Sequence, residues 1–432
     1  MSVSAPADLS EAAKAGVEKS ITRLIVATSI GNALEWYDIT IYGYFAVYIS
    51  KAFFPNDDQA TSLLVTFGTF GLAYLARPVG GIVLGAYADR YGRKASLLIS
   101  IVLMTLGTLT VAVMPTYGSI GILAPIAVLL ARLVQGFSAG GEFGSSTAFL
   151  VEHRPERRGF VASWQFASQG LSNLLASAFG VGLTAWMTPA DLTSWGWRIP
   201  FLFGVLIGPI GIYIRNHLED ATVPPAAQIS PVREVFLYQK SRVLLGIGAL
   251  AISTAVNYLI IYMPTYVVKN FNLPPLAGFT ATFVGGIMVT LITPFAGMAS
   301  DRIGRTRHMI AVNILLLLSI FPVFLLIVNY PTPAVIVFAV FWLSTLKALY
   351  YGPLAALMSE LLPRATRATG LGLGYNIGVT LFGGMGPATM TWLGGFALIG
   401  DLAPGYYLTA IGILNLGTLL TIHVTQAALR EA

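Results

Sequence analysis

The chain has 432 residues, of which 56% are hydrophobic and only 10% are charged. A soluble domain is typically about 25% charged, so this composition excludes a water-soluble protein and indicates one whose surface faces a lipid bilayer. The sequence contains no cysteine, which excludes disulfides and thiolate metal sites. The formal charge of +6 does not indicate a nucleic-acid partner, because the basic residues lie in short loops beside apolar segments, where membrane topology explains them.

Twelve apolar segments are long enough to cross about 30 Å of hydrocarbon as helices. Residues 1–20 mix acidic and basic side chains without an apolar core, so we expect a cytoplasmic segment there and no signal peptide. The stretch 216–241 contains several prolines and scattered charges, and we expect it to be a cytoplasmic linker between halves at 21–215 and 242–428. The segments lie at 22–50, 62–87, 95–114, 121–149, 160–186, 198–215, 242–268, 277–299, 308–329, 333–359, 368–396 and 404–427.

Basic residues are concentrated in every second loop between the apolar segments. The loops after the second, fourth, sixth, eighth and tenth segments are rich in arginine and lysine, whereas the others hold little beyond Lys51, Arg198 and Lys269. The positive-inside rule therefore places the basic loops and both termini in the cytoplasm. We expect a multi-pass protein of the cell inner (cytoplasmic) membrane.

Two motifs occur twice, about half a chain length apart. GAYADRYGR at 85–93 matches GMASDRIGR at 297–305, and EHRP at 152–155 matches ELLP at 360–363. Two motifs repeated at nearly the same offset indicate duplication, and hence two similar six-helix halves related by a pseudo-two-fold axis.

The first repeated motif also predicts a gate. Asp89 and Asp301 can accept hydrogen bonds from a neighbouring helix N-terminus, where the helix dipole favours negative charge. The arginines beside them can pair across the two halves and hold the cytoplasmic side shut until the protein opens inward. The alternative is topology alone, because positive residues belong on that side in any case. The candidate gating arginines are Arg90, Arg93, Arg302 and Arg305.

The doubled motif in a chain of six plus six segments resembles the major facilitator superfamily. GNALEWYD at 31–38, RPVGG at 77–81, RLVQG at 132–136, GGEFG at 140–144 and WGWRIP at 195–200 together resemble its metabolite:proton symporter family. Members of that family carry citrate, tricarballylate, 2-oxoglutarate, shikimate, proline or betaine. The resemblance implies an all-α membrane protein of 12 transmembrane helices, with a cavity lined by the first, fourth, seventh and tenth. It also links the R-x-x-Q-G sequence to proton transfer.

Six charged residues lie well inside the apolar segments. Each unpaired charge there costs roughly 2.5–3.5 kcal/mol on insertion scales, so these residues are candidates for function. Three are acidic and three are basic, which indicates an interior network that gains a surplus positive charge when one carboxylate is protonated. They are Glu35, Asp38, Glu142, Arg77, Arg132 and Lys347.

Glu35 and Asp38 are the leading candidates for proton coupling. They are three residues apart and so share one helical face. Two nearby carboxylates in a low dielectric do not both ionise easily, so one of them is expected to take up a proton. The alternative for Glu35 is a structural pair within the bundle. Glu142 is a third candidate for proton coupling.

Arg132 and Lys347 are the candidate ligands for an anion. Arg132 can clamp a carboxylate with two parallel hydrogen bonds, or it can form a structural salt bridge to Asp38 or Glu142. Lys347 has no acidic neighbour in its own segment, so it needs a partner from another helix or from the substrate.

Neutral polar residues complete the predicted cavity. Side chains of this kind also join transmembrane helices to one another, which is the alternative for each of them. The candidates for substrate contact are Asn32, Tyr42, Gln135, Gln165, Gln169, Asn257, Tyr350, Tyr375 and Asn376.

These residues predict a proton-coupled symporter that imports an organic anion by alternating access, most simply a di- or tricarboxylate such as citrate. The alternatives are a zwitterionic osmolyte such as betaine or proline, which predicts an aromatic box and an internally paired Lys347, or a monocarboxylate such as shikimate. No hydrolase or zinc-protease motif is present, so we do not expect an enzyme, and we expect no metal or other cofactor. The expected coupling ion is H⁺, with Na⁺ left open, and we expect a functional monomer.

Overall fold

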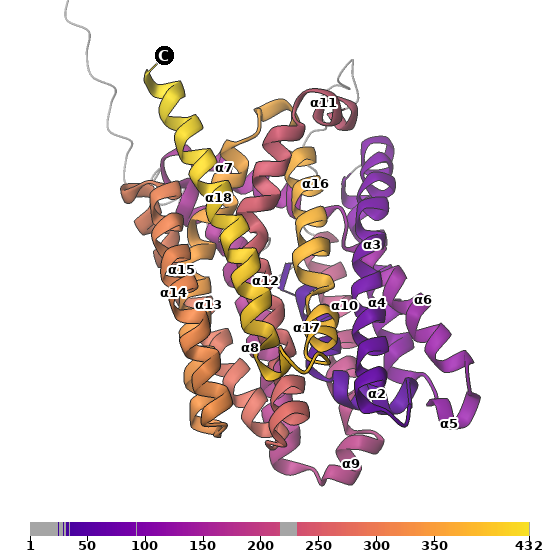
Figure 1. Cartoon of the computed structure of the whole chain (residues 1–432). Helices are drawn as coiled ribbons and strands as arrows, with labels where there is room; N and C mark the ends of the chain where they lie inside the picture. The colour runs from indigo at the N-terminus through magenta and orange to yellow at the C-terminus, as the bar shows by residue number, and fades with distance from the viewer. Residues whose placement is uncertain are drawn as a thin grey trace, which may run out of the picture.

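The computed structural model describes residues 25, 29, 32–33, 35–91, 93–216 and 231–431, and this part of the chain is a bundle of long helices without strands (Figure 1). Helical residues at 35–44 precede α2. The first half contains α2 (Ala46–Phe53), α3 (Gln59–Tyr91), α4 (Arg93–Val113), α5 (Tyr117–Ile120), α6 (Leu123–Ser138), α7 (Glu142–His153), η1 (Pro155–Arg157), α8 (Arg158–Trp186), α9 (Pro189–Ser194), η2 (Gly196–Arg198) and α10 (Ile199–Asn216). Within the expected linker 216–241, residues 217–230 lie outside the described part, and Pro231–Tyr238 form α11. The second half contains α12 (Lys240–Phe271), α13 (Pro275–Ile303), α14 (Arg305–Asn329), α15 (Pro333–Glu360), η3 (Arg364–Thr366), α16 (Arg367–Val379), η4 (Thr380–Gly384), α17 (Gly386–Leu393), η5 (Gly400–Leu402) and α18 (Ala403–Glu431).

Among the described residues, each predicted apolar segment corresponds to one helix or to a helix with an interruption. The first segment turns at Phe45, the fourth is interrupted between α6 and α7, and the eleventh contains the π-helical turn η4. Within the described part, seven helices are long and apolar enough to cross a membrane by length and composition. Most of the remaining segments are shorter or interrupted, and α8 has a polar inner face of serine, glutamine and asparagine.

The two halves meet along two seams. In one seam α8 of the first half packs against α13 of the second, and glycines allow their backbones to approach closely. A Cβ atom on Gly159 would lie 2.4 Å from the carbonyl oxygen of Gly297, and one on Gly286 would lie 2.7 Å from the backbone nitrogen of Leu174. In the other seam α3 packs against α16, η4 and α17, where Gly384 meets the ring of Tyr74.

The interior and the surface differ in the way that a bilayer requires. Large aromatic side chains are buried, and so are Asp38, Arg77, Arg132 and Lys347 in the middle of the bundle, where Glu35 is partly buried. The outward faces of α10, α13, α14 and α18 expose leucine, phenylalanine, isoleucine and valine. Lipid has no polar groups with which to satisfy exposed charges in its core, so the charged side chains face inward. The middle of the bundle is therefore where a functional site is to be sought.

Candidate functional site

One polar group lies inside the first half, between the helix at 35–44 and helices α4, α6 and α10. Arg132 Nη1 donates to Gln135 Oε1 at 2.7 Å, and Gln135 Nε2 donates to Thr108 Oγ1 at 2.8 Å. The Asp38 carboxylate lies beside Thr108 and against Gly204, where an added Cβ would come within 2.6 Å of Asp38 Oδ1. We call Asp38, Thr108, Arg132 and Gln135 the N-half cluster.

Arg132 is not ion-paired within the described part of the chain. Its guanidinium carbon lies 4.4 Å from the ring centre of Tyr42 and 5.3 Å from that of Phe70, as in a cation–π contact. Its Nε and Asp38 Oδ1 are both buried without a hydrogen-bond partner there. The salt bridge to Asp38 that the sequence left open is therefore not formed in this conformation. The side chain of Glu142, its other possible partner, lies outside the described residues.

A second group lies where the two halves meet. Arg77 Nη2 is 3.9 Å from Glu35 Oε1, and its guanidinium lies over the rings of Tyr74 and Trp36 at 4.5 and 5.6 Å. The Tyr258 hydroxyl donates to the Tyr74 hydroxyl at 2.5 Å, which joins α12 of the second half to α3 of the first. We call Glu35, Trp36, Tyr74, Arg77 and Tyr258 the interface cluster.

The sequence reasoning counted Arg77 among the intramembrane charges but did not place it at the site, and it missed Tyr74. The available signal was local: Tyr74 and Arg77 are three residues apart in one helix, directly before the proline and glycines at 78–81.

A third group surrounds Lys347 in the second half. Lys347 is 0% exposed, its Nζ donates to Asn257 Oδ1 at 2.9 Å, and it lies 5.2 Å from the ring centre of Tyr351. In the part of the chain that the structure describes, no carboxylate lies within 4 Å of this ammonium. The structure thus brings together two of the predicted substrate ligands, Lys347 and Asn257. We call Asn257, Lys347 and Tyr351 the Lys347 cluster.

Tyr350, a candidate for substrate contact, is bonded within the second half. Its hydroxyl donates to the carbonyl of Ala249 at 2.7 Å and to Asn415 Oδ1 at 2.9 Å. These bonds hold α15 against α12 and α18. Tyr351, the next residue, supplies the ring beside Lys347.

The predicted amide and tyrosine ligands divide into two sets. The first set lies within the first half, where Asn32 Nδ2 donates to the backbone carbonyl of Gln165 at 2.8 Å. At the junction of the halves, Gln169 Nε2 donates to the Tyr375 hydroxyl at 3.0 Å and Asn376 Nδ2 donates to the Gly140 carbonyl at 2.7 Å. Only the second set lies between the halves.

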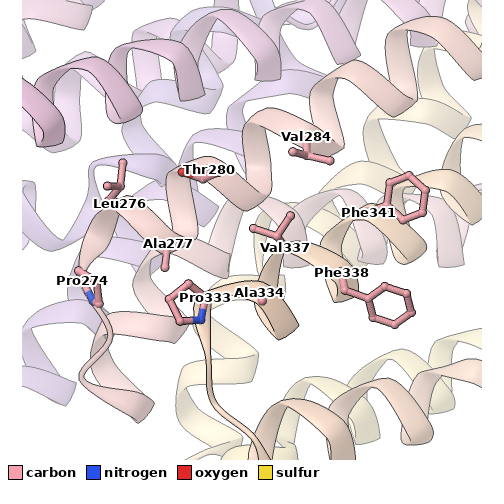
Figure 2. A pocket seen from close by; sticks show the side chains of 10 residues that line it. All are labelled: Pro274, Leu276, Ala277, Thr280, Val284, Pro333, Ala334, Val337, Phe338 and Phe341. Carbon is pink, nitrogen blue, oxygen red and sulfur yellow. The ribbon is translucent and has the colours of Figure 1, made fainter.

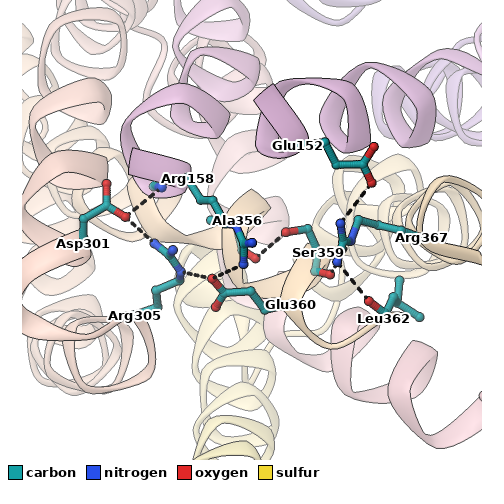
Figure 3. Close-up of polar contacts among 10 residues, drawn as sticks. Glu152, Arg158, Asp301, Arg305, Ala356, Ser359, Glu360, Leu362 and Arg367 are labelled. Carbon is teal, nitrogen blue, oxygen red and sulfur yellow. Dashed lines mark hydrogen bonds and ion pairs between the residues drawn. The ribbon is translucent and has the colours of Figure 1, made fainter. Parts of the chain in front are cut away.

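Ion pairs connect the halves at one end of the bundle (Figure 3). Asp301 accepts hydrogen bonds from the backbone N–H groups of Gly159 and Phe160 at 2.9 and 3.1 Å, which is the contact with a helix N-terminus expected from the sequence. Arg305 then bridges Asp301 and Glu360, at 2.8 Å to each. Arg302 is exposed and makes no ion pair among the described residues. The side chains of Asp89, Arg90 and Arg93 lie outside the described part.

The same end contains a reciprocal pair of ion pairs that the sequence did not predict. Glu152 of the first half pairs with Arg367 of the second at 3.0 Å, and Glu360 of the second pairs with Arg158 of the first at 3.9 Å. Glu152 and Glu360 are the glutamates of the two E-x-x-P motifs. Each pairs with an arginine that follows the other copy of the motif: Arg367 follows the second copy and Arg158 the first. We call Glu152, Arg158, Arg305, Glu360 and Arg367 the ion-pair end.

A groove of about 580 Å³ lies on the outside of the second half, between the first turns of α13 and α15 (Figure 2). Thr280 is the one polar side chain among its lining residues, and none of them belongs to the clusters above. A groove without charges, on a face of the bundle that has apolar exposed side chains, fits lipid contact better than recognition of a charged substrate. Its lining residues are Pro274, Leu276, Ala277, Thr280, Val284, Pro333, Ala334, Val337, Phe338 and Phe341.

Two helical halves with charged side chains at their junction and ion pairs across one end are the architecture of a membrane transporter. A sequence model described as "Major Facilitator Superfamily" matches residues 28–387, and the chain belongs to that superfamily.

The chain is similar to named relatives over nearly its whole length. It is 37% identical to a citrate-proton symporter of Klebsiella pneumoniae (91% of this chain, 89% of that one) and 34% identical to one of Salmonella typhi (93% of each). It is also 34% identical to a putative proline/betaine transporter of Staphylococcus aureus strain COL (95% and 90%). A crystal structure of a D-xylose-proton symporter matches with a TM-score of 0.74 at 16% identity, over 92% of this chain and 97% of that one. The predicted family and fold class are confirmed.

Proposed function

We propose that the protein is a proton-coupled symporter that imports an organic anion by alternating access, with a di- or tricarboxylate such as citrate as the substrate. The observation that carries this proposal is Lys347, a fully buried ammonium whose described polar partner is a neutral amide. Burying a cation without a counter-ion is costly, and an anionic substrate would supply that counter-ion. The citrate-proton symporters among the relatives support the same substrate class.

Protons are needed because of the charge of such a substrate. Each net negative charge that enters against an inside-negative potential costs about 2.3 kcal/mol per 100 mV, and a co-transported proton cancels it. Asp38 is a buried carboxyl group and Glu35 a partly buried one, and each lies beside an arginine, so we propose that they carry the protons. The ion-pair end holds the basic loops, so we place it on the cytoplasmic side of the inner membrane, with both termini.

A zwitterionic osmolyte is the second candidate, and two observations favour it. The interface cluster places Trp36, Tyr74 and Tyr258 close together, and aromatic faces of this kind bind quaternary ammonium groups. The putative proline/betaine transporters among the relatives are similar to this chain along nearly all of their length. Against this candidate, Lys347 has no internal carboxylate partner in the described part.

Counterflow in proteoliposomes preloaded with citrate separates the candidates. We expect unlabelled citrate and other di- or tricarboxylates to compete with labelled citrate, and betaine and proline not to compete. Competition by betaine without competition by citrate would reject the anion proposal. A pH jump that drives accumulation of the same substrate tests proton coupling directly.

Asp38→Asn tests the proton role of the N-half cluster. The amide matches the carboxyl in shape but holds no exchangeable charge, so we expect acid-driven accumulation to be lost while exchange of internal for external substrate continues. Acid-driven accumulation at the wild-type level in this variant would show that Asp38 carries no coupled proton.

A further inference from the structure

Arg77 is a buried guanidinium with unused hydrogen-bonding capacity. It is 2% exposed, and among the described residues no hydrogen bond is formed by its guanidinium N–H groups. The carboxylate oxygen Glu35 Oε1 is the nearest one in the described part of the chain, at 3.9 Å from Nη2, well beyond the roughly 2.7–2.9 Å of a charge-assisted hydrogen bond. Arginine carries five N–H donors in a fixed fork that matches a carboxylate. The site therefore has donors for one more carboxylate.

The surroundings of Arg77 hold it in place and keep water away. The rings of Tyr74 and Trp36 lie against its guanidinium, and Tyr74 is bonded across the halves to Tyr258. Its backbone is fixed as well, because Gly140 packs so closely that a Cβ atom there would lie 2.1 Å from the Arg77 carbonyl oxygen. A fixed cation in a water-poor site attracts an anion more strongly than one in solvent.

The other ionisable groups around Arg77 come from four helices. Tyr74 is on α3, Tyr258 on α12 and Tyr375 on α16, while Arg132 on α6 is engaged with Gln135 and the ring of Tyr42. Among the described side chains that act on Arg77, Glu35 is the one carboxylate. A second carboxylate brought to Arg77 would thus meet the charge of Glu35.

We propose that Arg77 binds a carboxylate of the substrate and that Glu35 competes with the substrate for this guanidinium. Two carboxylates cannot both stay ionised at one buried cation without strong repulsion. Glu35 must therefore take up a proton before the substrate carboxylate binds, and it releases that proton when the substrate leaves and Glu35 returns to Arg77. This inference rests on the proposed anion symport and assigns its coupling step to one pair of residues.

The arrangement also favours substrates with at least two carboxylates. Arg77 is on α3 of the first half and Lys347 on α15 of the second. Between them lie the packed rings of Tyr375, Phe166 and Tyr351, with 4.2 Å between the ring centres of Phe166 and Tyr351 and 6.5 Å between those of Phe166 and Tyr375. These rings fill the space between the two cations, so a small dicarboxylate can reach both only in a conformation in which the rings have separated, and a monocarboxylate can satisfy only one cation.

The test is citrate binding to the purified full-length protein, measured from acidic to alkaline pH. In the wild type we expect the affinity to fall as Glu35 loses its proton, approaching about tenfold per pH unit if one proton is required. Glu35→Gln is permanently neutral, so its affinity should stay near the acidic wild-type value and lose that pH dependence. Both proteins meet the same mixture of citrate ionic forms, so the difference between their pH profiles reports Glu35 alone.

Two further variants complete the test. Glu156→Gln makes the same change at an exposed glutamate in η1 and should keep the wild-type profile. Arg77→Lys keeps the charge but loses the fork, and we expect citrate binding at least about tenfold weaker in a protein that unfolds at the same temperature. A wild-type pH profile in Glu35→Gln, or unchanged affinity in a folded Arg77→Lys, overturns this inference. If the wild type binds betaine and not citrate at every pH, the proposed function itself fails.

Discussion

At the scale of single residues, Lys347 is the sharpest test of the substrate's charge. Lys347→Met keeps the length of the side chain and removes its ammonium group. A hydrogen bond to a charged group is worth about 1.5–3 kcal/mol, so we expect the half-saturation concentration for citrate uptake to rise by about 10- to 100-fold.

The stability of this variant should change little. The lost bond to Asn257 is offset because a cation no longer has to be buried without a counter-ion. Lys240→Met, at an exposed lysine that begins α12, is the matched control and should transport like the wild type. Uptake by Lys347→Met with wild-type half-saturation would show that this ammonium does not bind the substrate.

At the scale of elements, the seam between α8 and α13 depends on facing glycines near the ion-pair end. A Cβ atom on Gly297 would lie 2.5 Å from the Gly159 carbonyl oxygen, so Gly297→Ala forces the two helices apart. We expect a lower unfolding temperature and slower transport, because overpacking typically costs 1–3 kcal/mol. Gly417→Ala in α18 meets no atom within 4 Å and should be neutral or slightly stabilising, since alanine is the better helix former. Equal unfolding temperatures for the two variants would mean that this seam tolerates separation.

The helices also show which features of the fold could be predicted from the sequence and which could not. Apolar length located the spans, and duplicated motifs located the halves, because both signals lie in local stretches of sequence. The interruptions at Phe45, between α6 and α7, and at η4 were not predicted. They occur where helices pack against one another, as Gly140 does against the Arg77 carbonyl, and no local pattern encodes such contacts.

The same distinction applies to the site. Charged side chains stand out in an apolar sequence, so Asp38, Arg132 and Lys347 could be named as candidates. Their partners could not, because pairs such as Lys347 with Asn257 join residues 90 positions apart on different helices. The sequence also did not show which of two adjacent tyrosines lies beside the lysine: the Tyr350 hydroxyl bonds to Asn415 and the Ala249 carbonyl, whereas the ring of Tyr351 lies beside Lys347.

At the scale of the whole molecule, the reciprocal ion pairs of the ion-pair end hold the two halves together on one side. Each crosses between the halves, and Glu360 also binds Arg305 at 2.8 Å. Exposed ion pairs contribute about 0–1 kcal/mol each, so removing one should shift the balance between closed and open states by up to about fivefold. The pair of Glu360 with Arg305 lies within the second half, so Glu152, whose ion pair across the halves is the shorter at 3.0 Å, should have the larger effect.

The cysteine-free chain makes this shift measurable. Ala368→Cys places a single thiol on α16, where the Ala368 carbonyl faces Gly144 across the halves, and its rate of alkylation reports opening at this end. We expect Glu152→Gln and Glu360→Gln to speed alkylation, Glu152→Gln more, and Glu156→Gln to leave it unchanged. Exchanging the charges of one pair, Glu152→Arg with Arg367→Glu, should return the rate toward that of the reporter alone, because attraction across the halves is restored.

Salt should speed alkylation of the reporter alone and have little effect once both glutamates are neutral, since screening acts only on charges that are present. If neutralising both glutamates leaves the rate unchanged, these pairs do not hold the end closed, and the packing of α8 on α13 must do so instead.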